Sequence, residues 1–181
     1  MLKKPLVTLI LGFLLGALVV WWPNGLGIHT FMVVETKSTM DYENTITAIM
    51  QATKEKGWKI PTVHRLDKSM QKFGHTVPPT AVIELCHPTY AVKILKEDDA
   101  RMVSSFMPCR LSVYEKSDGS VIISRMNSSL MSSIFPDLIS DVMAGATAEV
   151  EEIIQTALAN PPLPAPKEQP KPAEEEHADA S

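Results

Sequence analysis

Two cysteines, a histidine and a methionine are the residues of this sequence best suited to chemistry. Cys86 and His87 are adjacent, and Met107 stands two residues before Cys109. Thiolate, imidazole and thioether groups are the ligands with which proteins hold copper, zinc or haem iron. One hypothesis is therefore a soft-ligand site formed by Cys86, His87, Met107 and Cys109.

The same cysteines could instead form a disulfide. The chain has only two cysteines, and a bridge between Cys86 and Cys109 would stabilise the fold by about 3 kcal/mol in the chain-entropy model, if the compartment is oxidising. A third interpretation is that both are inert, buried thiols. The residues alone leave these three open. Arg110, next to Cys109, could hold an anion.

No catalytic signature accompanies these residues. The sequence has no Cys-x-x-Cys, no Gly-rich phosphate loop and no Gly-x-Ser-x-Gly elbow. A net charge of -4 and the lack of a basic stripe argue against a nucleic-acid partner. We therefore expect a non-enzymatic binding module for a metal, haem or a small redox-active ligand. Two alternatives are a structural or assembly protein with a Cys86–Cys109 disulfide, and a redox carrier.

The elements that position these residues follow from the spacing of apolar side chains. Alternating or β-branched segments predict strands at 29–35, 58–66, 80–87, 109–115 and 121–126. Helical spacing predicts long helices at 40–56 and 136–158 and a short helix from residue 88. Ser38 to Asp41 fits a capping box before the first helix. Asp118-Gly119 predicts a hairpin between the last two strands.

Strands that run in series between two long helices favour an α+β fold, with an antiparallel sheet covered by helices on one face. If strands 80–87 and 109–115 are antiparallel neighbours, the end of one lies beside the start of the next, and the candidate ligands meet at one rim. Side-chain alternation then puts His87 and Cys109 on one side and Cys86 on the other, unless a bulge intervenes. The uncovered face could line a cavity or pack against a second copy, so a homodimer is left open.

Residues 5–22 form an uncharged, apolar run that sets the location of the protein. In a helix the run spans roughly 27 Å, close to a bilayer core of about 30 Å. Lys3 and Lys4 precede the run, and Trp21 and Trp22 close it, so the positive-inside rule keeps the N-terminus in the cytoplasm. We predict a single-pass anchor in a bacterial inner membrane, with the lipid bilayer as partner and a periplasmic domain. A cleaved signal peptide is the alternative, and a membrane or periplasmic protein partner is left open.

Composition divides the chain into three parts. Residues 1–27 are the predicted N-terminal transmembrane anchor, and residues 28–160 are long enough for one domain with its own core. Residues 161–181 are rich in proline and glutamate and nearly free of large apolar side chains, so we expect a disordered tail.

The segment from 84 to 127 resembles a known family. Its motifs are Glu-Leu-Cys-His-Pro at 84–88, Met-Pro-Cys-Arg at 107–110, Val-Tyr-Glu-Lys-Ser-Asp-Gly at 113–119 and Ile-Ser-Arg-Met-Asn at 123–127. They are similar to the domain-of-unknown-function family 302. The resemblance covers about 28–160 and implies a compact α+β domain with the β-α-β4-α order of TATA-binding-protein-like folds, and self-association. It implies no established activity or substrate.

Overall fold

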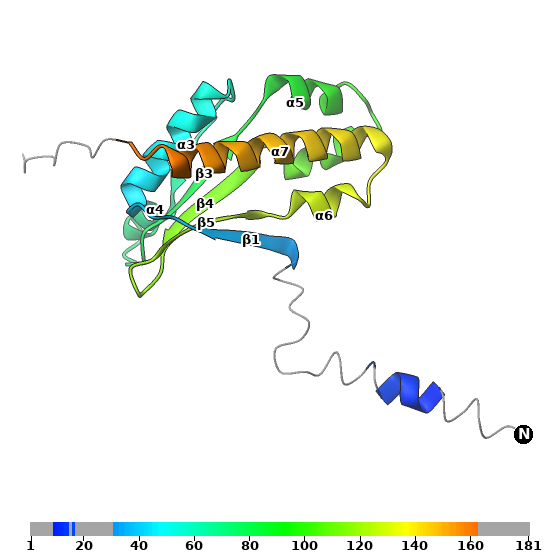
Figure 1. Cartoon of the computed structure of the whole chain (residues 1–181), viewed down its shortest axis with the longest axis horizontal. Helices are drawn as coiled ribbons and strands as arrows, with labels where there is room; N and C mark the ends of the chain where they lie inside the picture. Colours follow the sequence, from blue (N-terminus) through cyan, green and yellow to red (C-terminus); the bar gives the residue numbers. More distant parts are fainter. Residues whose placement is uncertain (1–8, 15, 17–30, 163–181) are drawn as a thin grey trace, which may run out of the picture.

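The structure of the chain, a computed structural model, describes residues 9–14, 16 and 31–162. Figure 1 shows its elements in space. In chain order they are β1 (Val33–Lys37), α3 (Tyr42–Glu55), β2 (Val63–Arg65), α4 (Leu66–Gln71), β3 (Thr80–Leu85), α5 (Pro88–Leu95), the 3-10 helix η1 (Arg101–Phe106), β4 (Cys109–Glu115), β5 (Val121–Met126), α6 (Ser128–Ser132) and α7 (Asp137–Ala159).

The five strands form one sheet in the order β1-β5-β4-β3-β2, and every neighbouring pair is antiparallel. The sheet therefore joins the N-terminal strand to the last strand of the series. Apart from the short helices, the chain has the order β-α-β4-α. The predicted α+β class and antiparallel sheet are confirmed.

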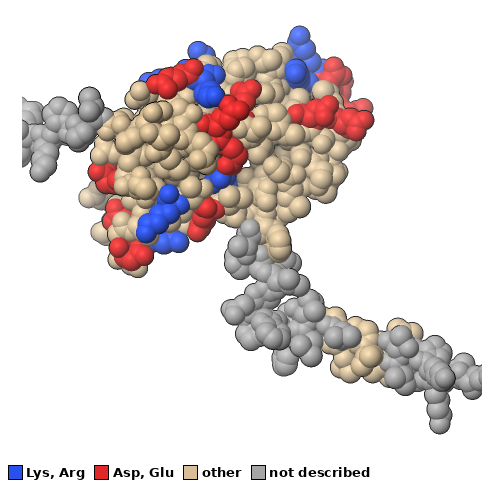
Figure 2. All heavy atoms as spheres, in the orientation of Figure 1, with Lys and Arg blue, Asp and Glu red and all other residues tan. Residues whose placement is uncertain are grey.

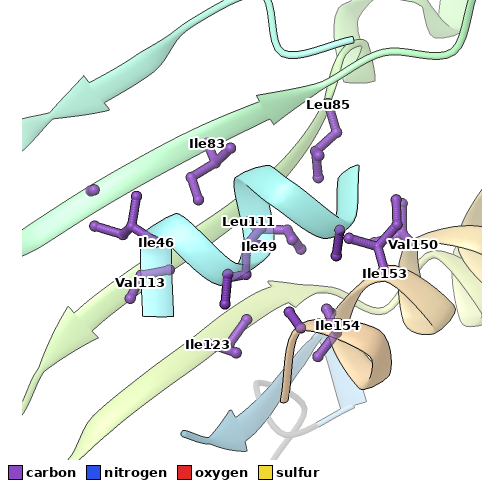
Figure 3. Close-up of a cluster of buried hydrophobic side chains, with 14 of the residues drawn as sticks. Ile46, Ile49, Ile83, Leu85, Leu111, Val113, Ile123, Val150, Ile153 and Ile154 are labelled. Atoms are coloured by element: carbon purple, nitrogen blue, oxygen red, sulfur yellow. The ribbon is translucent and has the colours of Figure 1, made fainter. Parts of the chain in front are cut away.

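Helices α3 and α7 cover one face of the sheet, and the core lies between the two layers (Figure 1). Ile83, Leu111 and Ile123 point from three adjacent strands toward the helices and are fully buried. Ile49 of α3 and Ile153 of α7 meet them from the other layer (Figure 3). Fully burying an aliphatic side chain of this size contributes about 1.5–3 kcal/mol, so this layer contact is the main source of stability.

The predicted elements agree with the structure best where the patterning is regular. Strands β4 and β5 have the predicted bounds. Helices α3 and α7 begin and end within a few residues of the bounds predicted for them. Strand β1 begins at Val33, later than predicted, and the short helices α4 and α6 were not predicted.

The predicted strand at 58–66 is wrong over most of its length. Only Val63–Arg65 forms a strand, and Lys59 makes an isolated bridge with Cys86. Pro61 explains the interruption, because proline has no N–H to donate to a ladder.

The start of α3 also differs from the prediction. Asp41 is the N-cap and accepts a hydrogen bond from the backbone N–H of Asn44 at 2.8 Å. The predicted capping box at Ser38 is therefore wrong. The Ser38 hydroxyl instead lies 2.7 Å from that of Thr45 in the buried layer.

Most of the predicted membrane anchor lies outside the described residues, which include only 9–14 and 16 of the run at 5–22. In the parts of the chain that the structure describes, no helix is both long enough and apolar enough to cross a bilayer. Nearly all of the predicted tail, 163–181, also lies outside the described residues.

Candidate functional site

The end of β3 and the start of β4 bring the predicted ligands to one rim of the sheet. Leu85 pairs with Cys109 in the antiparallel register. The paired register ends there, two residues short of both His87 and Met107. Both residues have extended backbones, with φ and ψ of -110° and 116° at His87 and of -98° and 148° at Met107. The predicted antiparallel arrangement of these strands is confirmed.

The rim has two sides, and the predicted ligands are divided between them. Cys109 shares the helix-covered side with Leu85, and alternation along β3 puts His87 there too. Cys86 faces the opposite, open side. It exchanges both backbone hydrogen bonds with the exposed Lys59, at 2.8 and 2.9 Å, so these two side chains share one side.

This division changes what the cysteines can do. Both are free thiols, and the alternative Cys86–Cys109 disulfide is absent from the structure. Among residues 9–14, 16 and 31–162, no three His, Cys, Asp or Glu side chains are grouped so as to hold a metal ion. Cys86, His87 and Cys109 are therefore not grouped as one ligand set, and alternation turns Cys86 to the face of the sheet opposite Cys109.

Three residues that the sequence analysis did not select surround His87. Glu149 of α7 accepts hydrogen bonds from the indole Nε1–H of Trp58 at 2.7 Å and from the Tyr90 hydroxyl at 2.6 Å. The His87 ring packs edge-on against both aromatic rings, at 5.4 Å between centroids in each case. We call Trp58, His87, Tyr90 and Glu149 the rim cluster.

The rim cluster is held together by an ionised carboxylate. Hydrogen bonding from Tyr90, and then from Trp58, lowers the pKa of Glu149, and the positive charge of Lys56 acts in the same direction. The hydrogen bond between Tyr90 and Glu149 also raises the pKa of Tyr90. Glu149 is thus a fixed anion with both oxygens engaged, which ties α7 to the start of α5 and to the segment after α3.

Close packing of α7 on α5 depends on a glycine. A Cβ added at Gly145 would lie 3.1 Å from the Tyr90 ring and from its hydroxyl oxygen. The sequence contained one signal for the rim cluster. Glu149 lies on the buried face of α7, between Ala146 and Ile153, and a carboxylate at such a position requires partners.

On the helix-covered side of the rim, His87 has an unpartnered polar atom. Its Nδ1 is buried and has no hydrogen-bond partner. The thiol of Cys109 is also largely withdrawn from solvent, and burial, followed by the nearby Cys86, raises its pKa. Tyr90 packs against both hydrophobic clusters of the domain, Cys109 against the main one and Met107 against the smaller one. The thiol and the thioether therefore pack against different clusters, and the His87 ring contacts Tyr90, which packs against both.

Arg110 lies away from these groups. Alternation along β4 turns it to the open side of the sheet, where its guanidinium donates to Oε1 of Glu84 at 3.3 Å. His64 approaches the same oxygen at 3.2 Å. Arg110 is thus already paired with a carboxylate, and its predicted role in anion binding stays a prediction.

Comparisons with known proteins agree with this fold. The model of the family described as "Domain of unknown function DUF302" matches residues 34–160, more than half of the chain. The chain belongs to the DUF302 family. The crystal structure of an uncharacterized conserved DUF302 protein from Bacillus stearothermophilus is similar, with 19% sequence identity and a TM-score of 0.62. The match covers 70% of this chain and 98% of that one. At this identity the likeness shows the fold alone, and among curated proteins none matches this DUF302 chain.

Proposed function

We propose that this DUF302 chain is a periplasmic binding module, held at the bacterial inner membrane by residues 5–22, that binds a cuprous ion through His87, Met107 and Cys109. The module is non-catalytic, and the rim cluster positions His87 for ligation. The proposal keeps three of the four ligands predicted from the sequence and leaves Cys86 out.

The observation that carries the proposal is the buried Nδ1 of His87, which has no hydrogen-bond partner. Buried polar atoms are nearly always satisfied, and an exception calls for an explanation such as an ion or a water. A ring nitrogen free of hydrogen bonds is available as a metal ligand. The same rim carries the soft sulfur donors of Cys109 and Met107, which makes a soft ion a better explanation than a hard one.

The donor types favour cuprous copper over the other ions considered. Thiolate and thioether ligands select Cu(I), whereas structural zinc sites use four Cys, His or carboxylate ligands. No three such groups come together within the described residues. Haem would need an axial ligand and a broad apolar cleft. The sulfur donors at this rim instead pack against two hydrophobic clusters.

Protonation links binding to pH. Because burial raises the pKa of Cys109, the thiol is protonated at neutral pH and must release a proton when it ligates a metal. The apparent affinity is therefore expected to rise with pH. Glu149 has both oxygens engaged and a lowered pKa, so it is not a free base, which is consistent with binding and not with acid–base catalysis.

The two cysteines offer a matched pair for the test. The full chain in detergent is titrated anaerobically with Cu(I) against a chromophoric copper chelator. We expect Cys109→Ser and His87→Phe to weaken binding by on the order of tenfold or more, and Cys86→Ser to leave it nearly unchanged. Met107→Leu should weaken binding, whereas Met102→Leu, on the exposed surface of η1, should not.

Other outcomes would favour the alternatives. Equal losses in the two cysteine variants would mean that both thiols act together, as in a redox carrier or a disulfide-stabilised assembly protein. Visible absorption bands of haem in the purified protein would show that the bound ligand is haem and not copper. No retention of copper by the folded wild-type chain would contradict the proposal.

A further inference from the structure

One end of the domain exposes apolar side chains that come from segments far apart in the sequence. Six large apolar side chains there are between 38% and 71% exposed. We call them the apolar end: Phe31, Met32, Phe106, Leu130, Ile134 and Leu138. Exposed apolar groups that are gathered in one place generally mark a surface of interaction.

Hydrogen bonds and ring contacts join these residues into one surface. Asn127 donates its side-chain amide to the carbonyl of Phe31 at 2.9 Å and its backbone N–H to that of Met32 at 2.8 Å. The same residue caps α6, on which Leu130 lies. After α6 the chain reaches Ile134 and then Phe135, whose ring lies 6.4 Å from that of Phe106.

Five of the six residues of the apolar end lie in segments that carry no charge. No Lys, Arg, Asp or Glu occurs at 30–34, 102–109 or 126–136, and the sixth residue, Leu138, follows Asp137. Figure 2 shows an expanse of uncharged surface in the region where Figure 1 labels α6. The rest of the visible face carries acidic and basic side chains in mixture. A partner that binds here is therefore recognised by apolar contact and not by charge.

The position of the apolar end in the chain identifies the partner. It contains Phe31, and only residues 23–30 separate Phe31 from the apolar run at 5–22. Eight residues span at most about 29 Å when fully extended. If the run lies in a bilayer, the apolar end is the part of the domain that is tied closest to the membrane surface.

We propose that the apolar end docks onto the lipid bilayer, with its exposed side chains entering the boundary between headgroups and acyl chains. The proposal rests on the membrane tether of the proposed function, and not on copper binding. Apolar insertion without basic residues should depend little on ionic strength, in contrast to attraction by anionic lipids. Docking would hold the β1–α6 end against the membrane and leave α4, at the opposite end in Figure 1, away from it.

The test uses the full chain in nanodiscs of phosphatidylethanolamine and phosphatidylglycerol, with natural or brominated acyl chains. A fluorescent amino acid is incorporated at a single position in each protein. Ile134 reports on docking, and Leu130 is a second reporter if the Ile134 variant does not fold. Phe73, equally exposed but beyond α4, is the matched control, and Leu14 reports on the anchor.

We expect quenching by brominated lipid at Ile134 and Leu14, several times greater than at Phe73 and unchanged at high salt. Quenching at Leu14 with none at Ile134 or Leu130 would overturn docking and leave the tether intact. No quenching at any position, Leu14 included, would overturn the tether and docking with it. A blue-shifted emission at Ile134 without lipid quenching, together with cross-linked dimers, would assign the surface to a second copy and also overturn the proposal.

Discussion

Glu149 is the residue that ties the C-terminal helix to the rim, and its charge carries a testable consequence. It accepts from Trp58 and Tyr90 through different oxygens. Glu149→Gln removes the charge and replaces one acceptor oxygen by an NH2 group. Either the Trp58 indole or the Tyr90 hydroxyl then loses its acceptor. Hydrogen bonds to charged groups contribute about 1.5–3 kcal/mol. We expect a loss of roughly that size in the free energy of unfolding, measured by urea denaturation at neutral pH.

The lowered pKa of Glu149 also predicts a pH dependence. A carboxylate whose pKa is lower in the folded state stabilises the fold above its unfolded value, about 4.5, and that stability is lost as pH falls through the folded value. Unfolding measured from neutral to acidic pH should therefore show a smaller acid loss in Glu149→Gln than in the wild type. Glu152→Gln is the control, because its ion pair with Lys56 is exposed and worth at most about 1 kcal/mol. Equal acid losses in all three proteins would contradict this role of Glu149.

At the scale of elements, the hairpin between β4 and β5 depends on one backbone conformation. Gly119 has φ of 79°, and a Cβ built on it would meet nothing within 4 Å. Substitution there tests conformational strain without a steric clash. We expect Gly119→Val to cost about 1–3 kcal/mol of unfolding free energy and Gly119→Asn clearly less, because asparagine tolerates positive φ. Equal stability of the two variants in thermal or urea unfolding would contradict the strain argument.

At the scale of the whole molecule, the charges around the apolar run predict the orientation. Lys3 and Lys4 precede residues 5–22, and the next Lys or Arg is Lys37. The positive-inside rule therefore predicts export of everything after the run. Alkaline phosphatase fused after Ser181 should be active in whole cells, and a cytoplasmic reporter at the same position should not. An expressed but inactive phosphatase fusion beside an active cytoplasmic reporter would reverse the predicted topology.

Local patterns were sufficient for much of the fold and for part of the site. Alternation in β4 and β5 and the stripe of α7 predicted those elements because each repeats one short-range rule over many residues. The antiparallel register of β3 and β4 put His87 and Cys109 at one rim, and alternation assigned Cys86 to the opposite face of the sheet. The sequence had predicted both features, provided that no bulge intervened. Short helices such as α6 were missed because a single turn carries too little periodicity to detect.

The partners of Glu149 were decided only by the tertiary structure. Glu149 is 59 positions from Tyr90 and 91 from Trp58, and no local pattern relates residues at such separations. Their contact requires α7 to pack against α5, and Gly145 allows that close approach. The sequence by itself determined the layers, the rim and which side-chain types lie there. The orphaned Nδ1 of His87 and the apolar end arise where several distant segments meet, because burial and exposure are properties of packed surfaces and not of single segments.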